Sequence, residues 1–171
     1  LDGYVFKNEH QRHQVQGWIK EKSIPHLLFS GSAGIGKTTL AKILLNELEV
    51  NDLDVMEVNA SRDNGIGNLR EKITNFVQMI PFGDFKVVLL DEADYLTINA
   101  QAGLRGVMEE YSNTARFVLT CNYPNKVIPA IHSRCQEFKI DKPDQTEFTA
   151  RMAEILITEE INFDIDTLDT F

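Results

Sequence analysis

The stretch "GSAGIGKTT" at residues 31–39 follows directly on the apolar run "PHLLFS" at residues 25–30. Its three glycines allow the backbone to curl so that successive N–H groups point at one anion. Lys37 and Thr38 then open a helical pattern, where the helix N-terminus adds a partial positive charge. The spacing G-x-x-x-x-G-K-T between a strand and a helix predicts a phosphate cradle rather than a structural turn with an incidental lysine. The candidate phosphate-binding residues are Ser32, Ala33, Gly34, Ile35, Gly36, Lys37, Thr38 and Thr39.

A second apolar run, "VVLLDEAD" at residues 87–94, ends in the carboxylates Asp91 and Glu92. Strand ends are often acidic simply because the chain returns to solvent there. Because a phosphate loop precedes this run by one helix–strand unit, we favour a catalytic interpretation. Asp91 would hold Mg²⁺ together with the Thr38 hydroxyl, and Glu92 would orient and deprotonate the attacking water.

Five short apolar runs predict strands, and helical patterns lie between them. Several runs are continuous rather than alternating, which is typical of strands covered on both faces. This order predicts an α/β fold, with a five-stranded parallel sheet flanked by helices. The helical stripe before the third strand extends from Leu69 to Ile80. The predicted strands are 26–30, 54–59, 86–91, 116–122 and 136–140.

Pro143 and the acidic residues around it predict a new helix over 144–160. We therefore expect a nucleotide-binding domain at residues 1–141 and the start of a small helical lid domain at 142–171. The chain begins with Leu1 and stops at Phe171 within a helical pattern, so we expect it to be part of a longer protein.

The chain has 171 residues, 43% of them hydrophobic, and a net charge of −9. The content of hydrophobic residues supports a packed core, and the negative charge argues against nucleic acid as a partner unless one face is basic. No apolar run reaches the roughly 20 residues that cross a bilayer. Cys121 and Cys135 do not make a disulfide framework, so both are expected to be structural. This favours the cytoplasm, or the nucleus of a eukaryote or the host cytoplasm of a phage.

The sequence resembles the small ATP-hydrolysing subunits of sliding-clamp loaders of the replication factor C type, including phage versions, within the AAA+ ATPases. The resemblance covers roughly residues 10–140, and the "SRC" block at 133–135 is specific to clamp loaders. The blocks that carry it are "PHLLFSGSAGIGKTTLAKILLNEL", "VNASRDNGIGNLREKI", "VVLLDEAD", "LRGVMEEYSNTARFVLTCN" and "IPAIHSRCQEFKI".

The resemblance implies roles for residues that the sequence alone leaves open. Asn122 matches the first sensor, an amide that hydrogen-bonds the γ-phosphate or the attacking water; otherwise it is a turn asparagine. Arg134 matches the arginine finger, which stabilises charge on the nucleotide of the neighbouring subunit. Otherwise it is a surface arginine that caps the preceding helix. Asn59 matches the polar residue that holds the catalytic glutamate inactive until DNA binds.

The resemblance also implies DNA contacts at the start of "NGIGNLREKI" (64–73) and on the helix after the acidic pair. Backbone N–H groups near Ile66 and Gly67 would face a phosphate, with charge from Arg70 and Arg105. Such contacts follow the shape of the DNA backbone, so binding would be independent of sequence and sensitive to salt. An ordinary solvated amphipathic helix is the alternative.

The function implied is hydrolysis of ATP with Mg²⁺, coupled to loading a sliding clamp at primer–template junctions. The resemblance implies that its partners are other loader subunits in a ring or spiral, a pentamer, together with the sliding clamp and primer–template DNA. Two alternatives stay open: another DNA-associated AAA+ ATPase, such as an initiator, helicase loader or branch-migration motor, or a non-hydrolysing scaffold subunit.

Overall fold

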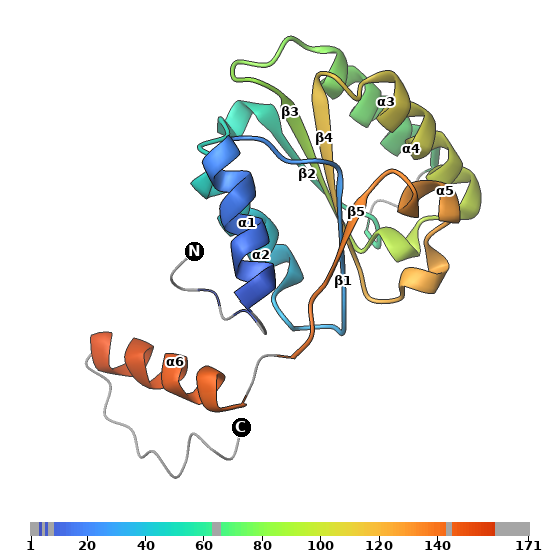
Figure 1. Cartoon of the computed structure of the whole chain (residues 1–171). Helices are drawn as coiled ribbons and strands as arrows, with labels where there is room; N and C mark the ends of the chain where they lie inside the picture. The colour runs from blue at the N-terminus through green and yellow to red at the C-terminus, as the bar shows by residue number, and fades with distance from the viewer. Residues whose placement is uncertain (1–3, 5, 7–8, 63–65, 143–144, 160–171) are drawn as a thin grey trace.

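The computed structural model describes residues 4, 6, 9–62, 66–142 and 145–159, and a parallel sheet forms its centre (Figure 1). The strand order is β2-β3-β4-β1-β5. Each strand agrees with a predicted apolar run to within one residue at either end, which confirms the predicted fold class. The strands are β1 (Leu27–Ser30), β2 (Val55–Asn59), β3 (Lys86–Asp91), β4 (Ala115–Cys121) and β5 (Gln136–Lys139).

Helices cover both faces of the sheet (Figure 1). α1 (Glu9–Glu21) and α2 (Lys37–Glu47) pack on one face. α3 (Ile66–Gln78), α4 (Ile98–Glu110) and α5 (Pro129–His132) pack on the other. Successive strand residues alternate between the two cores, which is why the runs are continuously apolar. Three short 3₁₀ turns complete this part of the fold: η1 (Asp52–Asp54), η2 (Ala93–Tyr95) and η3 (Pro124–Lys126).

The parallel register brings the ends of the strands to one edge of the sheet. Ser30 pairs with Cys121, and Asn59 pairs with Asp91. We call this side, where the strands end, the carboxyl edge, and the opposite side the amino edge. The phosphate loop leaves from β1 at the carboxyl edge, so the residues that follow the neighbouring strands lie beside it.

One predicted helical position is wrong. Ile80 was expected on the buried stripe that begins at Leu69, but α3 ends at Gln78 and Ile80 is 89% exposed. Pro81 follows Ile80, and a residue before proline is disfavoured in the helical region of backbone space. The chain therefore leaves the helix before this side chain turns inward.

A buried ion pair lies at the amino edge, beneath the loop between α3 and β3. Lys86 Nζ is 2.8 Å from Asp54 Oδ1, and both side chains are almost fully buried. Asp54 also accepts hydrogen bonds from the backbone N–H groups of Phe82 and Gly83, at 3.0 and 2.8 Å. The pair therefore fixes the backbone of the loop to η1.

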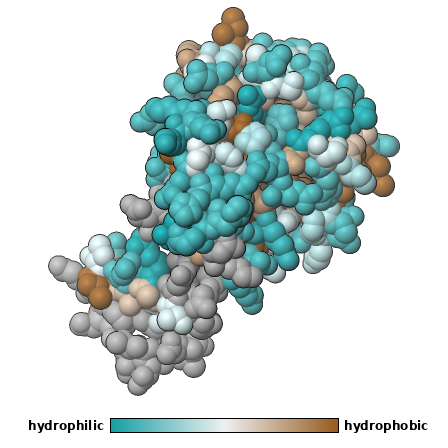
Figure 2. Space-filling model, in the orientation of Figure 1, coloured by the Kyte–Doolittle hydropathy of each residue, from teal (hydrophilic) through white to brown (hydrophobic). Residues whose placement is uncertain are grey.

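The loop held in this way exposes apolar side chains. Met79, Ile80 and Phe82 are all exposed, as is Leu53 in the neighbouring turn η1. We call these four residues the apolar tip. Figure 2 shows hydrophobic residues projecting at the top of the view, where Figure 1 places the loop between α3 and β3.

α6 (Gln145–Thr158) falls within the helix predicted at 144–160, and it lies apart from the layers of the sheet and its helices (Figure 1). Residues 143–144 and 160–171 of the predicted lid region lie outside the described residues. Within the described ranges, no helix is long and apolar enough to span a membrane.

Candidate nucleotide site

The phosphate loop turns sharply between β1 and α2, and its glycines permit this path. Gly34 and Gly36 have φ angles of 75° and 86°, in the left-handed region that side chains disfavour. Gly31 is constrained by packing as well, because a Cβ there would lie 2.1 Å from the carbonyl oxygen of Ile140. The loop is thus packed against the segment after β5, and α2 begins directly at Lys37.

The Lys37 ammonium group is buried under this loop and makes three hydrogen bonds. It donates to the carbonyl oxygens of Gly31 at 2.9 Å and Ser32 at 2.6 Å, and to Asn122 Oδ1 at 2.8 Å. Burial lowers the pKa of Lys37. Three contacts match the three donors of an ammonium group.

The Asp91 carboxylate is hydrogen-bonded both to Thr38, the second residue of α2, and to Thr120 near the end of β4. Thr38 Oγ1 donates to Asp91 Oδ1 at 2.7 Å, and Thr120 Oγ1 donates to the same oxygen. Thr120 also accepts a hydrogen bond from the backbone N–H of Glu92 at 3.0 Å. Glu92 has a left-handed backbone with φ of 57°, a conformation that is uncommon for a residue with a side chain. This single hydroxyl therefore fixes both members of the acidic pair.

Asn122 follows β4, and the loop around it is held by a buried carboxylate. Asp94 Oδ2 accepts the backbone N–H of Tyr123 at 3.1 Å, and Asp94 is 6% exposed. Its other oxygen, Oδ1, is buried without a hydrogen-bond partner among the described residues. The structure thus brings together four predicted residues, Lys37, Thr38, Asp91 and Asn122, with Glu92 directly after Asp91.

The oxygen donors at this edge suit a hard cation. A threonine hydroxyl and a carboxylate in contact, Thr38 and Asp91, are of the ligand type that Mg²⁺ takes together with phosphate oxygens. No cluster of three or more His, Cys, Asp or Glu side chains suited to a metal occurs in the described part of the chain. Cys121 and Cys135 are free thiols, and burial raises the pKa of each to about 12. They have the environment of structural rather than reactive cysteines.

Arg134 lies at the opposite edge of the sheet. It comes two residues before β5, whose first residue Gln136 pairs with Leu27 at the start of β1. A four-residue strand spans about 13 Å, so the length of β1 separates Arg134 from its own phosphate loop. Arg134 Nη1 donates to the carbonyl oxygen of Ala130 at 2.6 Å, and Nη2 contacts Glu109 Oε1. The predicted alternative, an arginine that caps the preceding helix, describes the first of these contacts.

Asn59 lies at the carboxyl edge opposite Asp91. Its Oδ1 accepts hydrogen bonds from the backbone N–H of Ser61 at 3.0 Å and from the Ser61 hydroxyl at 2.6 Å. This is a local turn of the kind that asparagine often makes at the end of a strand. The side chain is therefore engaged within its own loop, one strand away from the acidic pair.

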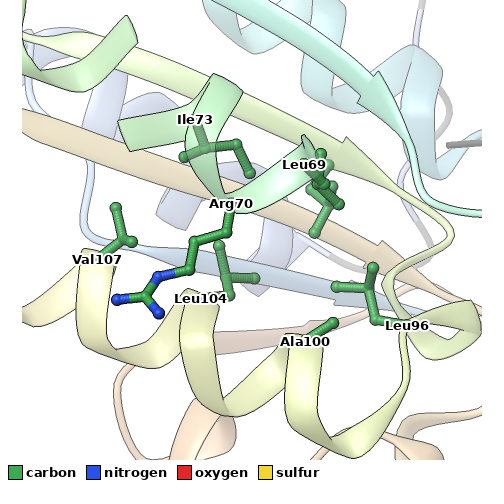
Figure 3. A pocket seen from close by; sticks show the side chains of 8 residues that line it. Leu69, Arg70, Ile73, Leu96, Ala100, Leu104 and Val107 are labelled. Carbon is green, nitrogen blue, oxygen red and sulfur yellow. The ribbon is translucent and has the colours of Figure 1, made fainter. Parts of the chain in front are cut away.

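The candidate DNA-contact residues lie on α3 and α4. Ile66 and Gly67 form the backbone start of α3, and the preceding residues 63–65 lie outside the described residues. Arg70 and Arg105 are exposed. Figure 3 shows the Arg70 side chain extending from α3 across α4, over a small apolar pocket between the two helices. Gly103 makes room for it, because a Cβ there would lie 3.3 Å from Arg70 Cδ.

Sequence reasoning missed two residues that organise the site, and it missed the buried hydrogen-bonding role of a third residue on α4. Thr120 and Asp94 position the acidic pair and the loop after β4. Gln101, which precedes Arg105 by one turn of α4, is buried and donates to the carbonyl oxygens of Leu96 and Lys126. Gln101 lies on the same helical face as the apolar residues of α4, and a polar residue at such a position predicts a buried side chain that forms hydrogen bonds.

Comparison with known proteins agrees with this geometry. The model of the family described as "ATPase family associated with various cellular activities (AAA)" matches residues 27–143. A replication factor C small subunit of Methanococcus vannielii is 43% identical over 160 residues, which are 91% of this chain and 51% of the relative. One from Sulfurisphaera tokodaii is 41% identical over 161 residues, 92% of this chain and 49% of the relative. The chain thus spans about half the length of the curated relatives it matches.

The fold has solved counterparts. The Thermotoga maritima RuvB Holliday junction branch migration motor superposes with a TM-score of 0.77 at 16% identity, covering 99% of this chain and 56% of that one. At this identity the likeness concerns the fold alone.

The sheet and phosphate loop define a P-loop ATPase fold. The chain belongs to the AAA family, and its relatives named replication factor C small subunit confirm the resemblance stated above.

Proposed function

We propose that this chain is the ATP-binding and ATP-hydrolysing part of a small subunit of a sliding-clamp loader. The observation that carries the proposal is the convergence of Lys37, Thr38, Asp91 and Asn122 at one edge of the sheet. The relatives named replication factor C small subunit support the clamp-loader role. In this proposal residues 1–141 form the nucleotide-binding domain, and α6 belongs to a lid that begins at residue 142.

Lys37 and the loop would bind the phosphates of ATP. Its ammonium group would exchange contacts with loop carbonyls for contacts with the terminal phosphates, while Asn122 keeps the head group in place. The backbone N–H groups of residues 32–39 and the N-terminus of α2 add positive potential. Thr38 and Asp91 would hold Mg²⁺, which neutralises phosphate charge when bound.

Glu92 would be the general base. Its backbone N–H is held by Thr120 and its left-handed conformation turns the chain directly after Asp91. The carboxylate would accept the proton of a water that attacks the γ-phosphate, and a positioned base of this kind contributes about 10²–10⁴ in rate. Asn59, one strand away, would restrain Glu92 through its amide N–H₂, since its oxygen is engaged with Ser61.

Arg134 would act on the nucleotide of a neighbouring subunit. Arg134 precedes β5, whereas the phosphate loop follows the adjacent strand β1, so the two lie at opposite edges of the sheet. This separation supports action in trans. Arginine fingers contribute about 10³–10⁵ in rate. A single chain would therefore lack one component of its site, and assembly would supply it.

DNA and the clamp would contact other surfaces. Arg70 and Arg105 lie exposed on adjacent helices, and the start of α3 adds backbone N–H groups, which supports sequence-independent contact with DNA phosphates. The apolar tip supports a protein partner at the amino edge, since exposed apolar groups of this kind mark interaction sites. We assign the clamp to this surface.

The proposal is tested with the full-length subunit and its partner subunits. Lys37→Ala should abolish tight ATP binding, and Glu92→Gln should bind ATP but leave it unhydrolysed. Both are read by equilibrium binding of nucleotide and by phosphate release in the presence of clamp and primed DNA. Unchanged ATP affinity in Lys37→Ala would contradict the phosphate-loop assignment, and normal turnover in Glu92→Gln would place the base elsewhere.

A further inference from the structure

Arg134 is held within its own chain by a carboxylate that no part of the proposed chemistry uses. Its Nη2 contacts Oε1 of Glu109, while Nη1 donates to the Ala130 carbonyl oxygen and to Ser133 Oγ at 3.3 Å. Both terminal nitrogens of the guanidinium group, which form the fork that grips a phosphate, are therefore engaged.

The position of Glu109 follows from the fold. α4 starts at the carboxyl edge after the acidic pair and runs back to the amino edge, so Glu109 in its last turn reaches the segment before β5. The side chains of Arg134 and Glu109 are 29% and 45% exposed, so the ion pair is open to solvent on one side.

Arg134 also borders a cleft of about 470 Å³ at the amino edge, which a neighbouring chain could enter. Arg116 lines the same cleft, but it donates to the backbone carbonyl oxygens of Ile24, Ser112 and Ala115. The guanidinium group of Arg116 is thus held by the backbone, whereas one nitrogen of Arg134 is held by a side chain, that of Glu109.

We propose that Glu109 is a positioning residue that holds Arg134 in cis and releases it when the nucleotide of a neighbouring subunit enters the cleft. This inference rests on the proposed role of Arg134 as a finger in trans. The Glu109 carboxylate competes with the γ-phosphate for Nη2 of Arg134, and its negative charge also opposes the approach of the phosphate. Retention by Glu109 therefore lowers the rate of hydrolysis until assembly on clamp and DNA closes the interface.

The size of the effect is limited by solvent exposure. A half-exposed ion pair favours the paired state by only about two- to five-fold, so a tightly docked phosphate displaces it readily. Removal of the carboxylate should accordingly raise the hydrolysis rate of the assembled loader without DNA by about two- to five-fold. The rate with clamp and primed DNA should change less, because Arg134 is already released in that state.

The experiment measures phosphate release by the full-length assembled loader with and without DNA. Glu109→Gln removes the charge, and Glu110→Gln is the matched control, since it makes the same charge change at the next, exposed position. Glu109→Ala is a second variant, and thermal unfolding checks that all variants are folded. A higher DNA-independent rate in both Glu109 variants, with the control unchanged, is the expected result. An unchanged or lower rate in folded Glu109 variants would overturn the proposal.

A double variant separates this inference from the proposed function. In an Arg134→Ala background, Glu109→Gln should have no effect, because there is no guanidinium group left to release. If Glu109→Gln still accelerates hydrolysis in that background, the carboxylate acts elsewhere and the inference fails while the finger stands. If Arg134→Ala alone leaves hydrolysis unchanged, the finger assignment fails, and the inference fails with it.

Discussion

Replacing Lys86 by methionine tests the role of the buried ion pair at the amino edge. Methionine keeps most of the length of the side chain, but it leaves Asp54 buried without its cation. Removing one partner of a buried pair costs about 3–5 kcal/mol. The N–H groups of Phe82 and Gly83 still bind Asp54, so we expect the lower end, about 3 kcal/mol. For a chain of this size that corresponds to a fall in Tm of about 6–12 °C.

The assay is thermal unfolding followed by circular dichroism, together with equilibrium binding of ATP. Lys22→Met is the matched control, because the Lys22 pair with Glu49 is exposed and contributes little. ATP affinity should be retained in Lys86→Met, since the pair lies at the edge away from the phosphate loop. A fall in Tm of less than about 2 °C would refute the reasoning that the pair stabilises the fold.

The same pair predicts a dependence of stability on pH. Burial raises the pKa of Asp54, but Lys86 and the two backbone N–H groups outweigh it, and the pKa is lowered overall. A carboxylate with a lowered folded pKa stabilises the fold fully above its unfolded pKa, about 3.9. That stabilisation is lost as the pH falls through the folded pKa. In Asp54→Asn this acid-dependent part of the loss in Tm should be absent.

Three further results are expected. Arg134→Ala subunits mixed with wild-type subunits should bind ATP normally but lower hydrolysis in the neighbouring site by about 10³-fold or more; loss confined to the variant's own site would contradict action in trans. Thr120→Val should lower hydrolysis more than ATP affinity, because it frees Asp91 from one of its donors; an equal loss of both would point to a general packing role. Although burial lowers the pKa of His132, its hydrogen bonds to Glu137 and to a backbone carbonyl oxygen raise the pKa overall. The protonated His132 therefore stabilises the fold below about pH 6.5, and this stabilisation is lost as the pH rises through the folded pKa. A pH profile of Tm that is the same in His132→Gln as in the wild type would contradict this.

The sequence was sufficient for the strands and the phosphate loop because both signals are local. The four residues of β3 that precede Asp91, at 87–90, are buried on both faces and are therefore continuously apolar. The loop spacing fixes Lys37 and Thr38 relative to α2. Ile80 was misplaced because the helical pattern of hydrophobic residues continued past the point where Pro81 ends the helix.

The contacts that escaped prediction join residues far apart in the chain. Thr120 bonds Asp91 across 29 positions and Arg134 contacts Glu109 across 25, and no local pattern encodes either pairing. The Thr120–Asp91 pairing depends on β3 and β4 being neighbours in the sheet, and the Arg134–Glu109 pairing depends on the edge of the sheet at which α4 ends. Asn122 illustrates the same limit: as a strand-end residue it is ordinary, and only the order β4-β1 in the sheet brings it to Lys37.

The two edges of the sheet divide the proposed work of this chain. The carboxyl edge carries the groups that would bind and hydrolyse a nucleotide, from Lys37 to Asn122, and the amino edge carries Arg134 and the apolar tip. Parallel strands enforce this division, because every loop that follows a strand lies at one edge and every loop that precedes one lies at the other. An arginine that precedes one strand, as Arg134 precedes β5, is therefore too far away to contact a phosphate bound by the loop that follows the adjacent strand of the same chain. Under the proposed function, hydrolysis would then depend on how subunits are stacked, and that dependence would couple the rate of hydrolysis to the clamp and DNA that set the stacking.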